Sequence, residues 1–562
     1  MNIRQFFSQL SQKLRPVEKK CPWILHYPAG LEWDAEILPK PLTALLLDAE
    51  KRFPGHVAVD FLGKTYTYEE IAISARAVAA GLQQLGIGKG STVGLFLPNS
   101  PHFIISYYAI LLAGGTVVNF NPLYPVRDVK AQIEDARVEV MITFALTSLL
   151  GKLQGCHVRT LITADFADAL PFPKNVLFPL VKRKEILPVP SGEGHIAFRT
   201  LLEYDPATLC PVEIEPEEDI AVLQYTGGTT GQPKGAMLTH ANLYANTIQC
   251  GMWCTVLDDG AERILGALPC FHVFAMTAVM NLGIHKGMRI ILHPQFDLKA
   301  VLKDISKKRP TIMPGVPTIF NAINNYPKLG AYNLTSLKMC ISGGAGLPKE
   351  VKERFEEMTG CKLVEGYGLS ESSPVATVNP LFGVNKPGSI GMPLPGTLVE
   401  VVSTGFFHRA LPVGKIGEIC IRGPQVMKGY WNRPNETDAV LKDGRLHTGD
   451  IGYMDADGYF FIIDRLKEMI ISGGYNIYPR NIEEVIYMHE AVREAAVIGV
   501  ADAHWGQRVK AFVVVKEGHI LTEDALITFL RDKLPRFALP SEIEFRDTLP
   551  KTMIGKIAKK EL

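Results

Sequence analysis

The residues with the clearest chemical pattern lie in one loop, Tyr225 to Gly235, which reads YTGGTTGQPKG. Four of its eleven residues are glycines and three are threonines, and an apolar stretch at 221–224 precedes them. Glycines let backbone N–H groups turn toward an anion without a Cβ in the way. Lys234 adds a positive charge, and the fixed φ of Pro233 beside it favours a shaped loop over a mobile Thr/Gly linker. The loop is therefore predicted to hold a phosphate group.

A Walker-type nucleotide loop is the first alternative for this segment. That motif needs Gly, four residues, Gly-Lys and then Ser or Thr, and the chain contains no such run. The eleven residues instead resemble the signature of the adenylate-forming superfamily of acyl-CoA synthetases, luciferases and peptide-synthetase adenylation domains. This resemblance implies a set of loop residues around the phosphates of ATP: Thr226, Gly227, Gly228, Thr229, Thr230, Gly231 and Lys234.

Composition limits the class of protein. A length of 562 residues exceeds what one core usually supports, so several subdomains are expected. Lys and Arg number 59 against 58 Asp and Glu, a balance that argues against a nucleic-acid partner. The nine cysteines are scattered without a C-x-x-C pair, which gives no zinc or disulfide pattern and suits a reducing cytosol. A cytoplasmic protein is expected.

Apolar strands and amphipathic helices alternate from Leu42 onward. The segment 66–86 has the spacing of a long helix ended by Gly86, and short apolar strands lie on either side of it. This alternation predicts an α/β fold with mainly parallel sheets covered on both faces. The longest apolar run, 103–120, contains polar residues and a Gly pair, so it is read as a buried helix followed by a strand, not a membrane span.

The later segments predict further subdomains. Strands of period two at 386–402 and 416–431, interrupted by Gly and Pro, predict a barrel-like β subdomain. Together with the resemblance, the pattern implies two doubly wound α/β subdomains plus this β subdomain in a large AMP-binding and acyl-binding domain at 1–464. A small mobile α+β domain at 465–562 would carry an interdomain hinge and a catalytic lysine.

Several strand ends carry further candidate site residues. Tyr367 follows a strand among glycines and offers a flat face for a purine, and Glu371 supplies a hard oxygen ligand for Mg²⁺. Ser370 stands where the family pattern Tyr-Gly-x-Thr-Glu has Thr, and it keeps the hydroxyl. The resemblance implies a set of nucleotide contacts outside the loop: Gly344, Ala345, Glu365, Gly366, Tyr367, Ser370, Asp450 and Arg465. The metal ligands are predicted to be Glu371 and Thr226.

Three candidate site residues could also have a purely structural role when they are judged without the family resemblance. His272 follows a strand between two Phe residues and could be a core histidine, and Asp450 could cap its own turn. Lys556 near the end of the chain could belong to a solvated basic tail. The family motifs imply instead that His272 lines the carboxylate pocket, Asp450 binds ribose hydroxyls and Lys556 is catalytic with Glu371.

The block DRLKEMI at 464–470 resembles the family's interdomain hinge, with Lys467 at the pivot. The segment 472–476, which contains Gly473 and Gly474, is implied to line the entry of the CoA arm. In similar enzymes, rotation of the small domain separates two half-reactions, so Lys556 serves only the first.

The chain most resembles bacterial-type long-chain fatty-acid CoA ligases, with Gly227 where many relatives have Ser. The expected pocket wall, 272–276 and 315–318, is small or apolar and has no Lys or Arg. The resemblance therefore implies ATP, Mg²⁺, coenzyme A and a long-chain fatty acid. A fatty-acyl-AMP ligase that loads a carrier protein, a CoA ligase for a medium-chain or aryl acid, and a non-catalytic binder stay open.

Two segments are candidates for contact with a membrane surface. The first sixteen residues are not a secretory signal but could form a short amphipathic helix, and the Pro-rich basic stretch at 171–191 could rest on an anionic surface. A solvated surface excursion is the alternative for 171–191. Peripheral contact with the inner face of a membrane and a homodimer stay open.

Overall fold

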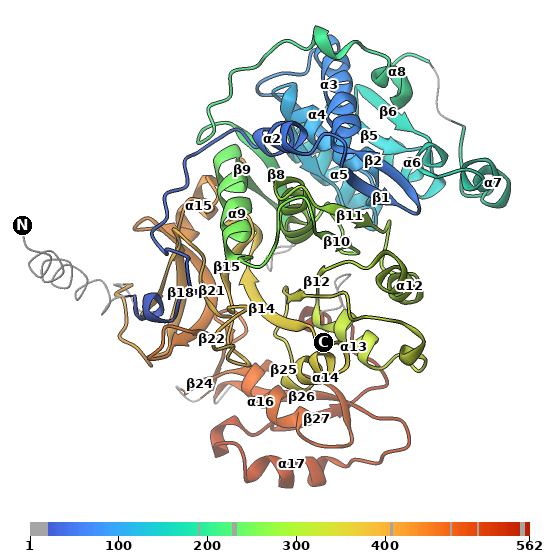
Figure 1. Ribbon diagram of the computed structural model, residues 1–562. Coiled ribbons are helices and arrows are strands. Elements are labelled where there is room, and N and C mark those ends of the chain that lie inside the picture. Colours follow the sequence, from blue (N-terminus) through green and yellow to red (C-terminus); the bar gives the residue numbers. More distant parts are fainter. Residues whose placement is uncertain are drawn as a thin grey trace, which may run out of the picture. The chain divides into compact units, whose positions relative to one another are not determined.

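The structure is a computed structural model that describes residues 21–188, 192–226, 233–404, 408–472, 475–502, 505–550 and 557–562 (Figure 1). The chain divides into two compact units. The first contains the chain through Leu398 and Ile421–Leu446, and the second contains Val399–Cys420 and His447–Leu562. The expected α/β architecture with a separate C-terminal part is confirmed.

The first unit contains a nine-stranded sheet in the order β16-β15-β14-β13-β12-β10-β11-β1-β2. Neighbours from β14 to β1 are parallel, whereas β2, β15 and β16 pair antiparallel at the edges. The strands are β1 (Val57–Phe61), β2 (Lys64–Thr67), β10 (Arg263–Gly266), β11 (Arg289–Leu292), β12 (Ile312–Gly315), β13 (Met339–Ser342), β14 (Lys362–Gly368), β15 (Val375–Val378) and β16 (Met392–Pro393).

A second sheet of the same unit has eight strands in the order β19-β9-β8-β4-β3-β5-β6-β7. It is parallel from β8 to β7, and β9 and β19 add an antiparallel edge. The strands are β3 (Thr92–Phe96), β4 (Thr116–Asn119), β5 (Val140–Phe144), β6 (Thr160–Ala164), β7 (His195–Ala197), β8 (Ile220–Thr226), β9 (Lys234–Thr239) and β19 (Gly429–Tyr430).

Helices lie between these strands in the sequence, as the alternation predicts (Figure 1). The helices of the first unit are α2 (Ala44–Arg52), α3 (Tyr68–Gln84), α4 (Pro101–Leu112), α5 (Val126–Asp135), α6 (Thr147–Leu153), α7 (Lys174–Val181), α8 (Phe198–Leu202), α9 (His240–Trp253), α10 (Val273–Ala275), α11 (Leu282–His285), α12 (Leu298–Lys308), α13 (Pro317–Asn324), α14 (Lys349–Thr359) and α15 (Pro434–Val440). A π-helical segment, η4 (Met276–Asn281), joins α10 to α11.

Local sequence explains the ends of the long helix α3. The Thr67 hydroxyl accepts from the Glu70 N–H at 3.1 Å, and the Glu70 carboxylate accepts from the Thr67 N–H at 2.7 Å, which forms a capping box. After the helix, Gly86 has φ +84°, a conformation that favours glycine. The predicted helix and its stop signal are confirmed.

The apolar run 103–120 is a buried helix followed by a strand, as expected. Residues Pro101–Leu111 of α4 are all buried, and Gly114, with φ +86°, separates α4 from β4. Among the described residues, no helix combines the length and the apolar composition that crossing a membrane requires.

The second unit contains most of the β subdomain and all of the α+β part, whereas β20 and the ends of β18 and β21 between Ile421 and Leu446 are counted with the first unit. One sheet pairs β17 (Leu398–Val402), β18 (Gly417–Arg422), β21 (Arg445–Met454) and β22 (Phe460–Arg465), with the short β20 (Leu441–Lys442) at its edge. The other has the order β24-β23-β26-β25, with β27 beside β26. Its elements are β23 (Ile470–Ser472), β24 (Tyr475–Ile477), α16 (Pro479–Tyr487), β25 (Val492–Asp502), β26 (Gly506–Val515), α17 (Glu523–Arg531) and β27 (Glu542–Phe545).

Candidate active site

The predicted phosphate loop connects two paired strands. The register places Thr226 at the end of β8 opposite Lys234 at the start of β9, and the Thr226 hydroxyl donates to the Lys234 carbonyl at 3.5 Å. The strand predicted before the loop is confirmed as β8. The loop residues Gly227, Gly228, Thr229, Thr230 and Gly231 lie outside the described residues.

Tyr430 on β19 contacts both Lys234, at the end of the phosphate loop, and Glu371. The Lys234 Nζ lies 5.2 Å from the centroid of its ring, within cation–π range, and its hydroxyl donates to Glu371 Oε1 at 2.7 Å. Burial, together with the negative charge of Glu371, raises the pKa of Tyr430, so the phenol stays protonated and remains a donor. One tyrosine thereby holds a cation over its ring and a carboxylate at its hydroxyl.

The pairing of β19 with β9 explains this placement. Tyr430 lies opposite Ala236, and the next residue, Trp431, donates its N–H to the Gly235 carbonyl at 2.8 Å. Sequence reasoning missed Tyr430 because its segment was assigned to the barrel-like strands. No motif marks this tyrosine, which is 59 residues from its partner Glu371.

Asp135 at the end of α5 fixes the same edge of the sheet. Its carboxylate accepts from the Tyr225 hydroxyl at 2.5 Å and from Arg433 at 3.0 Å, and its carbonyl accepts from Trp431 Nε1 at 3.1 Å. Burial and this carboxylate raise the pKa of Tyr225, which keeps the bond from Tyr225 to Asp135 in place. Asp135 is a second residue that sequence reasoning missed.

The predicted adenine contacts lie at the carboxyl ends of neighbouring strands. Because β13 and β14 are parallel, the Gly343–Gly344 pair after β13 and residues 365–367 of β14 lie at the same edge of the sheet. Gly344 has φ +80° and is exposed together with Ala345. Glu365 is buried and accepts from the Leu347 N–H at 3.2 Å.

Tyr367 and Gly366 belong to β14 itself and not to the loop after it. They pair with β15, Gly366 opposite Val378 and Tyr367 opposite Thr377, and the Tyr367 side chain is half-buried. The Pro374 carbonyl approaches the next residue, Gly368, so closely that an added Cβ would lie 1.8 Å from it. Only glycine fits there, and the chain then turns through the short helix that carries Ser370 and Glu371.

His272 begins α10, where its Nδ1 accepts from the Phe274 N–H at 3.3 Å. The preceding carbonyl, that of Phe271, accepts from Gln224 Nε2 on β8 at 3.2 Å. Phe274 in turn lies against Gly343, because a Cβ there would be 3.0 Å from its ring. The structure thus brings the half-buried His272 and the Gly pair into one part of the first unit.

Asp450 and Arg465 meet in the second unit. They are register partners on β21 and β22, and Arg465 Nε donates to Asp450 Oδ1 at 3.0 Å. The assignment of Asp450 to a turn was wrong, because β21 runs without a break through Arg445–Met454. Asp450 is 4% exposed, so its ion pair with Arg465 is shielded from water on one side.

The predicted hinge lies in the turn between β22 and β23. Lys467 is exposed, and its neighbour Leu466 donates its N–H to the Gly449 carbonyl at 2.8 Å. Gly473, Gly474 and Lys556 lie outside the described residues. The strand ends and the Asp450–Arg465 pair are parts of the predicted site that the structure describes, and Tyr430 is an addition to them.

Two family models match this chain. The model described as AMP-binding enzyme matches residues 46–431, and the model of the AMP-binding enzyme C-terminal domain matches residues 481–556. The chain belongs to this family. The matched range 46–431 spans every strand of the two large sheets of the first unit.

Relatives of known function cover nearly the whole chain. A long-chain-fatty-acid–CoA ligase of Bacillus subtilis is 47% identical, over 97% of this chain and 98% of the relative. A protein of the same name from Salmonella typhimurium is 39% identical over the same shares. ATP-bound MatB from Rhodopseudomonas palustris has a TM-score of 0.81 at 28% identity, covering 93% of this chain and 98% of MatB.

Proposed function

We propose that this chain is an AMP-forming ligase that activates a long-chain fatty acid with ATP and transfers the acyl group to coenzyme A. The observation that carries the proposal is Tyr430, whose ring lies beneath a lysine at the end of the phosphate loop and whose hydroxyl donates to the carboxylate of Glu371. Similarity to long-chain-fatty-acid–CoA ligases over nearly the full length supports the substrate class.

The reaction has two steps. In the first, a carboxylate oxygen of the fatty acid attacks the α-phosphorus of ATP, a new O–P bond forms and pyrophosphate leaves. In the second, the CoA thiolate attacks the acyl carbon, the thioester forms and AMP leaves. Both steps need positioning and stabilisation of charge on phosphate oxygens more than proton transfer.

Each part of the described site fits a role in this scheme. Lys234 and the Thr226 hydroxyl would face the departing pyrophosphate, and Tyr367 and the Gly343–Gly344 backbone would bind adenine. Asp450, next to Arg465, would accept the ribose hydroxyls. The apolar segments around His272 and Gly315 would receive the acid, with His272 positioning the carboxylate.

The residues at Glu371 fit a magnesium ion. A carboxylate that accepts one hydrogen bond from Tyr430 is a hard oxygen ligand, and the Thr226 hydroxyl offers a second oxygen. Glu371 and Thr226 would hold Mg²⁺, which supplies positive charge to offset the polyphosphate. Tyr430 would orient the carboxylate for this task.

The division of labour between the steps rests on movement about Lys467. We place the mobile domain at 465–562 and the larger domain at 1–464, with Lys556 serving the first step and the segment at Gly473 and Gly474 serving CoA. The exposed position of Lys467 in a turn between two strands supports a pivot there, since such turns absorb backbone rotation.

Product formation from acids of different length tests the proposal. With ATP, Mg²⁺ and CoA, we expect acyl-CoA and AMP to form faster from hexadecanoate than from octanoate, benzoate or acetate. Chromatography of the thioester and a coupled assay for AMP measure this. Acyl adenylate without thioester would instead indicate a carrier-loading ligase, and turnover of none of the acids would contradict the proposed site.

Helix α7 supports a peripheral membrane contact, which we propose as part of the function. No residue of α7 is buried, and five apolar side chains of this region are exposed by 50% or more: Phe172, Val176, Leu177, Leu180 and Val181. Exposed Lys182, Arg183 and Lys184 follow directly. An apolar helix beside three cations suits an anionic lipid surface. The sequence pattern predicts a Pro-rich stretch at 171–191 and no helix there, whereas the structure forms α7 with Pro179 inside it.

Binding to vesicles tests this contact. We expect the protein to sediment with vesicles that contain phosphatidylglycerol more than with phosphatidylcholine alone, and less at high salt. The double change Leu180→Glu and Val181→Glu should lower partitioning at least about tenfold, since burying each side chain is worth about 1.5–3 kcal/mol. Ile520→Glu, at a 94% exposed site in the other unit, is the matched control. Equal partitioning of the double variant and the control would contradict the contact.

A further inference from the structure

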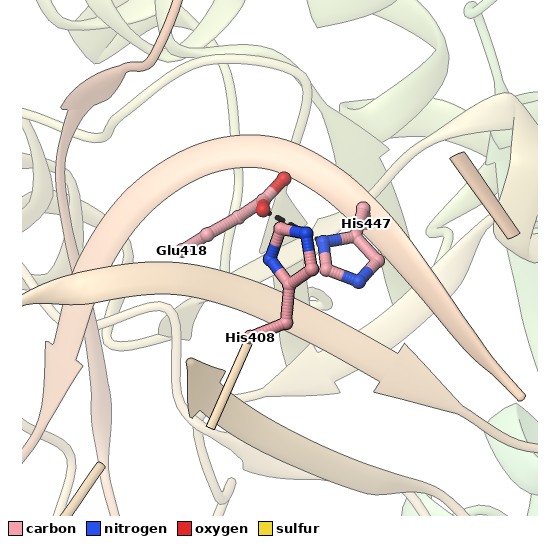
Figure 2. A group of neighbouring side chains, drawn as sticks. All are labelled: His408, Glu418 and His447. Atoms are coloured by element: carbon pink, nitrogen blue, oxygen red, sulfur yellow. Dashed lines mark hydrogen bonds and ion pairs between the residues drawn. The ribbon is translucent and has the colours of Figure 1, made fainter. Parts of the chain in front are cut away.

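Two histidines and a glutamate gather in the β subdomain of the second unit (Figure 2). They are His408, Glu418 and His447, and one potential ligand atom from each lies within 4.8 Å of the others. Among the described residues this is the one group of three or more His, Cys, Asp or Glu side chains with such spacing. None of the three has a role in the proposed reaction.

Three segments bring these side chains together. Glu418 lies on β18 and His447 on β21, and both are buried, at 6% and 7% exposure. His408 precedes β18 and is half-buried, with its ring centroid 4.7 Å from that of His447. The cluster is therefore largely shielded from water, and in such surroundings a charged carboxylate needs polar or metal partners.

Hydrogen bonding leaves part of the cluster unsatisfied. His447 Nδ1 lies 2.7 Å from Glu418 Oε2. By contrast, His408 Nδ1 and His447 Nε2 are buried without a hydrogen-bond partner among the described residues. Native structures pair most buried polar atoms, so two orphaned imidazole nitrogens beside a buried carboxylate call for a further binding partner.

We propose that His408, Glu418 and His447 bind one divalent transition-metal ion of the Zn²⁺ class. Two imidazoles and one carboxylate form a known ligand set for Zn²⁺, whereas Mg²⁺ prefers oxygen ligands alone. The Cys420 sulfur, two residues along β18 from Glu418, lies 3.5 Å from His447 Nδ1 and adds a soft donor beside the cluster. This site is separate in residues and in chemistry from the magnesium ligands of the proposed reaction.

The geometry needs only small movements to accept the ion. Ligand atoms about 2.0–2.1 Å from a tetrahedral Zn²⁺ are about 3.3 Å from one another. One potential ligand atom from each residue lies within 4.8 Å of the others, a spread from which side-chain movements of about 1–2 Å reach this spacing. The half-buried His408 side chain, which lies outside the strands, would make most of this movement.

A metal at this position would act as a structural brace for the strand that carries Asp450. Glu418 Oε1 accepts from the Gly449 N–H at 2.9 Å, and the Thr448 hydroxyl donates to the Ile419 carbonyl at 2.7 Å. The ion would thus tie the segment before β18 to the residues directly preceding Asp450. Loss of the ion is expected to loosen this part of the second unit first.

Cobalt binding tests the site directly. The full-length protein, freed of metal with a chelator and kept without nucleotide, is titrated with Co²⁺ and followed by visible absorption. We expect one saturable equivalent with the intense d–d bands of a tetrahedral site, and displacement of these bands by Zn²⁺. We also expect Zn²⁺ to raise the melting temperature, since it binds the folded state.

Single variants test whether Co²⁺ binds at the cluster of His408, Glu418 and His447. His408→Gln and Glu418→Gln should each weaken Co²⁺ binding by more than about 100-fold, because changes to mere outer-shell partners cost about 10–100-fold. His519→Gln, at an exposed histidine of the same unit, is the control and should bind as the unaltered protein does.

Because His408 lies outside the strands, His408→Gln keeps the test valid if Glu418→Gln fails to fold. Its melting curve without metal should match that of the unaltered protein. Absence of tetrahedral bands in the unaltered protein, or equal Co²⁺ affinity in His408→Gln and His519→Gln, would overturn the proposal.

Discussion

Replacing Lys556 with alanine is expected to abolish formation of the acyl adenylate while sparing thioester formation from supplied acyl adenylate. In the proposed function this lysine stabilises the phosphate oxygens on which charge builds in the first step only. Loss of one such stabilising group typically costs about 10²–10³-fold in rate. Pyrophosphate release measures the first step, and AMP release from acyl adenylate and CoA measures the second.

The control for this prediction is Lys516→Ala, which removes the same charge from an exposed position of the second unit. Lys559 is unsuitable as a control, because it forms ion pairs with Glu468 at 3.1 Å and Glu483 at 2.8 Å. Similar losses in both steps for Lys556→Ala would argue that this lysine supports the structure and not the first transition state.

The second large effect is expected for Glu371→Gln. Glutamine keeps the shape of the side chain and an oxygen that can accept from Tyr430, but it removes the negative charge that the proposed magnesium site needs. We expect the rate of pyrophosphate release to fall by at least about 100-fold and its dependence on Mg²⁺ to shift to higher concentration. Initial rates over a series of Mg²⁺ concentrations measure both.

Two further variants provide the comparisons that are needed to interpret the effect of Glu371→Gln. Tyr430→Phe removes only the hydrogen bond to Glu371, so it should weaken the apparent Mg²⁺ affinity about 10–100-fold, as outer-shell changes do. Glu350→Gln, at an exposed position of α14, controls for the loss of one negative charge. An unchanged Mg²⁺ dependence in Glu371→Gln would remove this residue from the metal site.

The fold could be predicted in outline because its signals are local. Helix α3 has its apolar period, its Thr67 cap and its Gly86 stop in one continuous segment, and β8 directly precedes the phosphate loop. The small hairpin of β23 and β24 has three-residue strands, which are too short for a period to be recognised. Asp450 was placed in a turn because its Thr-Gly neighbours are typical of turns, yet strand pairing with β22 keeps it extended.

Candidate site residues within contiguous motifs could be predicted, and those that depend on tertiary pairing could not. Tyr430 reaches Glu371 only because β19 pairs with β9, a contact between distant segments that carries no local signal. Asp135 and the cluster of His408, Glu418 and His447 have the same origin. The spacing of the cluster matches no metal motif, so composition and cysteine spacing gave no reason to expect it.

The pairing of β19 with β9 also has a consequence for how the protein is made. About 190 residues separate β9 from β19. At about 5–20 residues per second, a ribosome needs on the order of 10–40 s to synthesise this intervening segment. During that interval β9 is an open edge strand of a nascent sheet, the kind of surface that recruits foreign strands. The same edge would be uncovered in any fragment that ends before Gly429, so a shortened version of the first unit is expected to aggregate during expression.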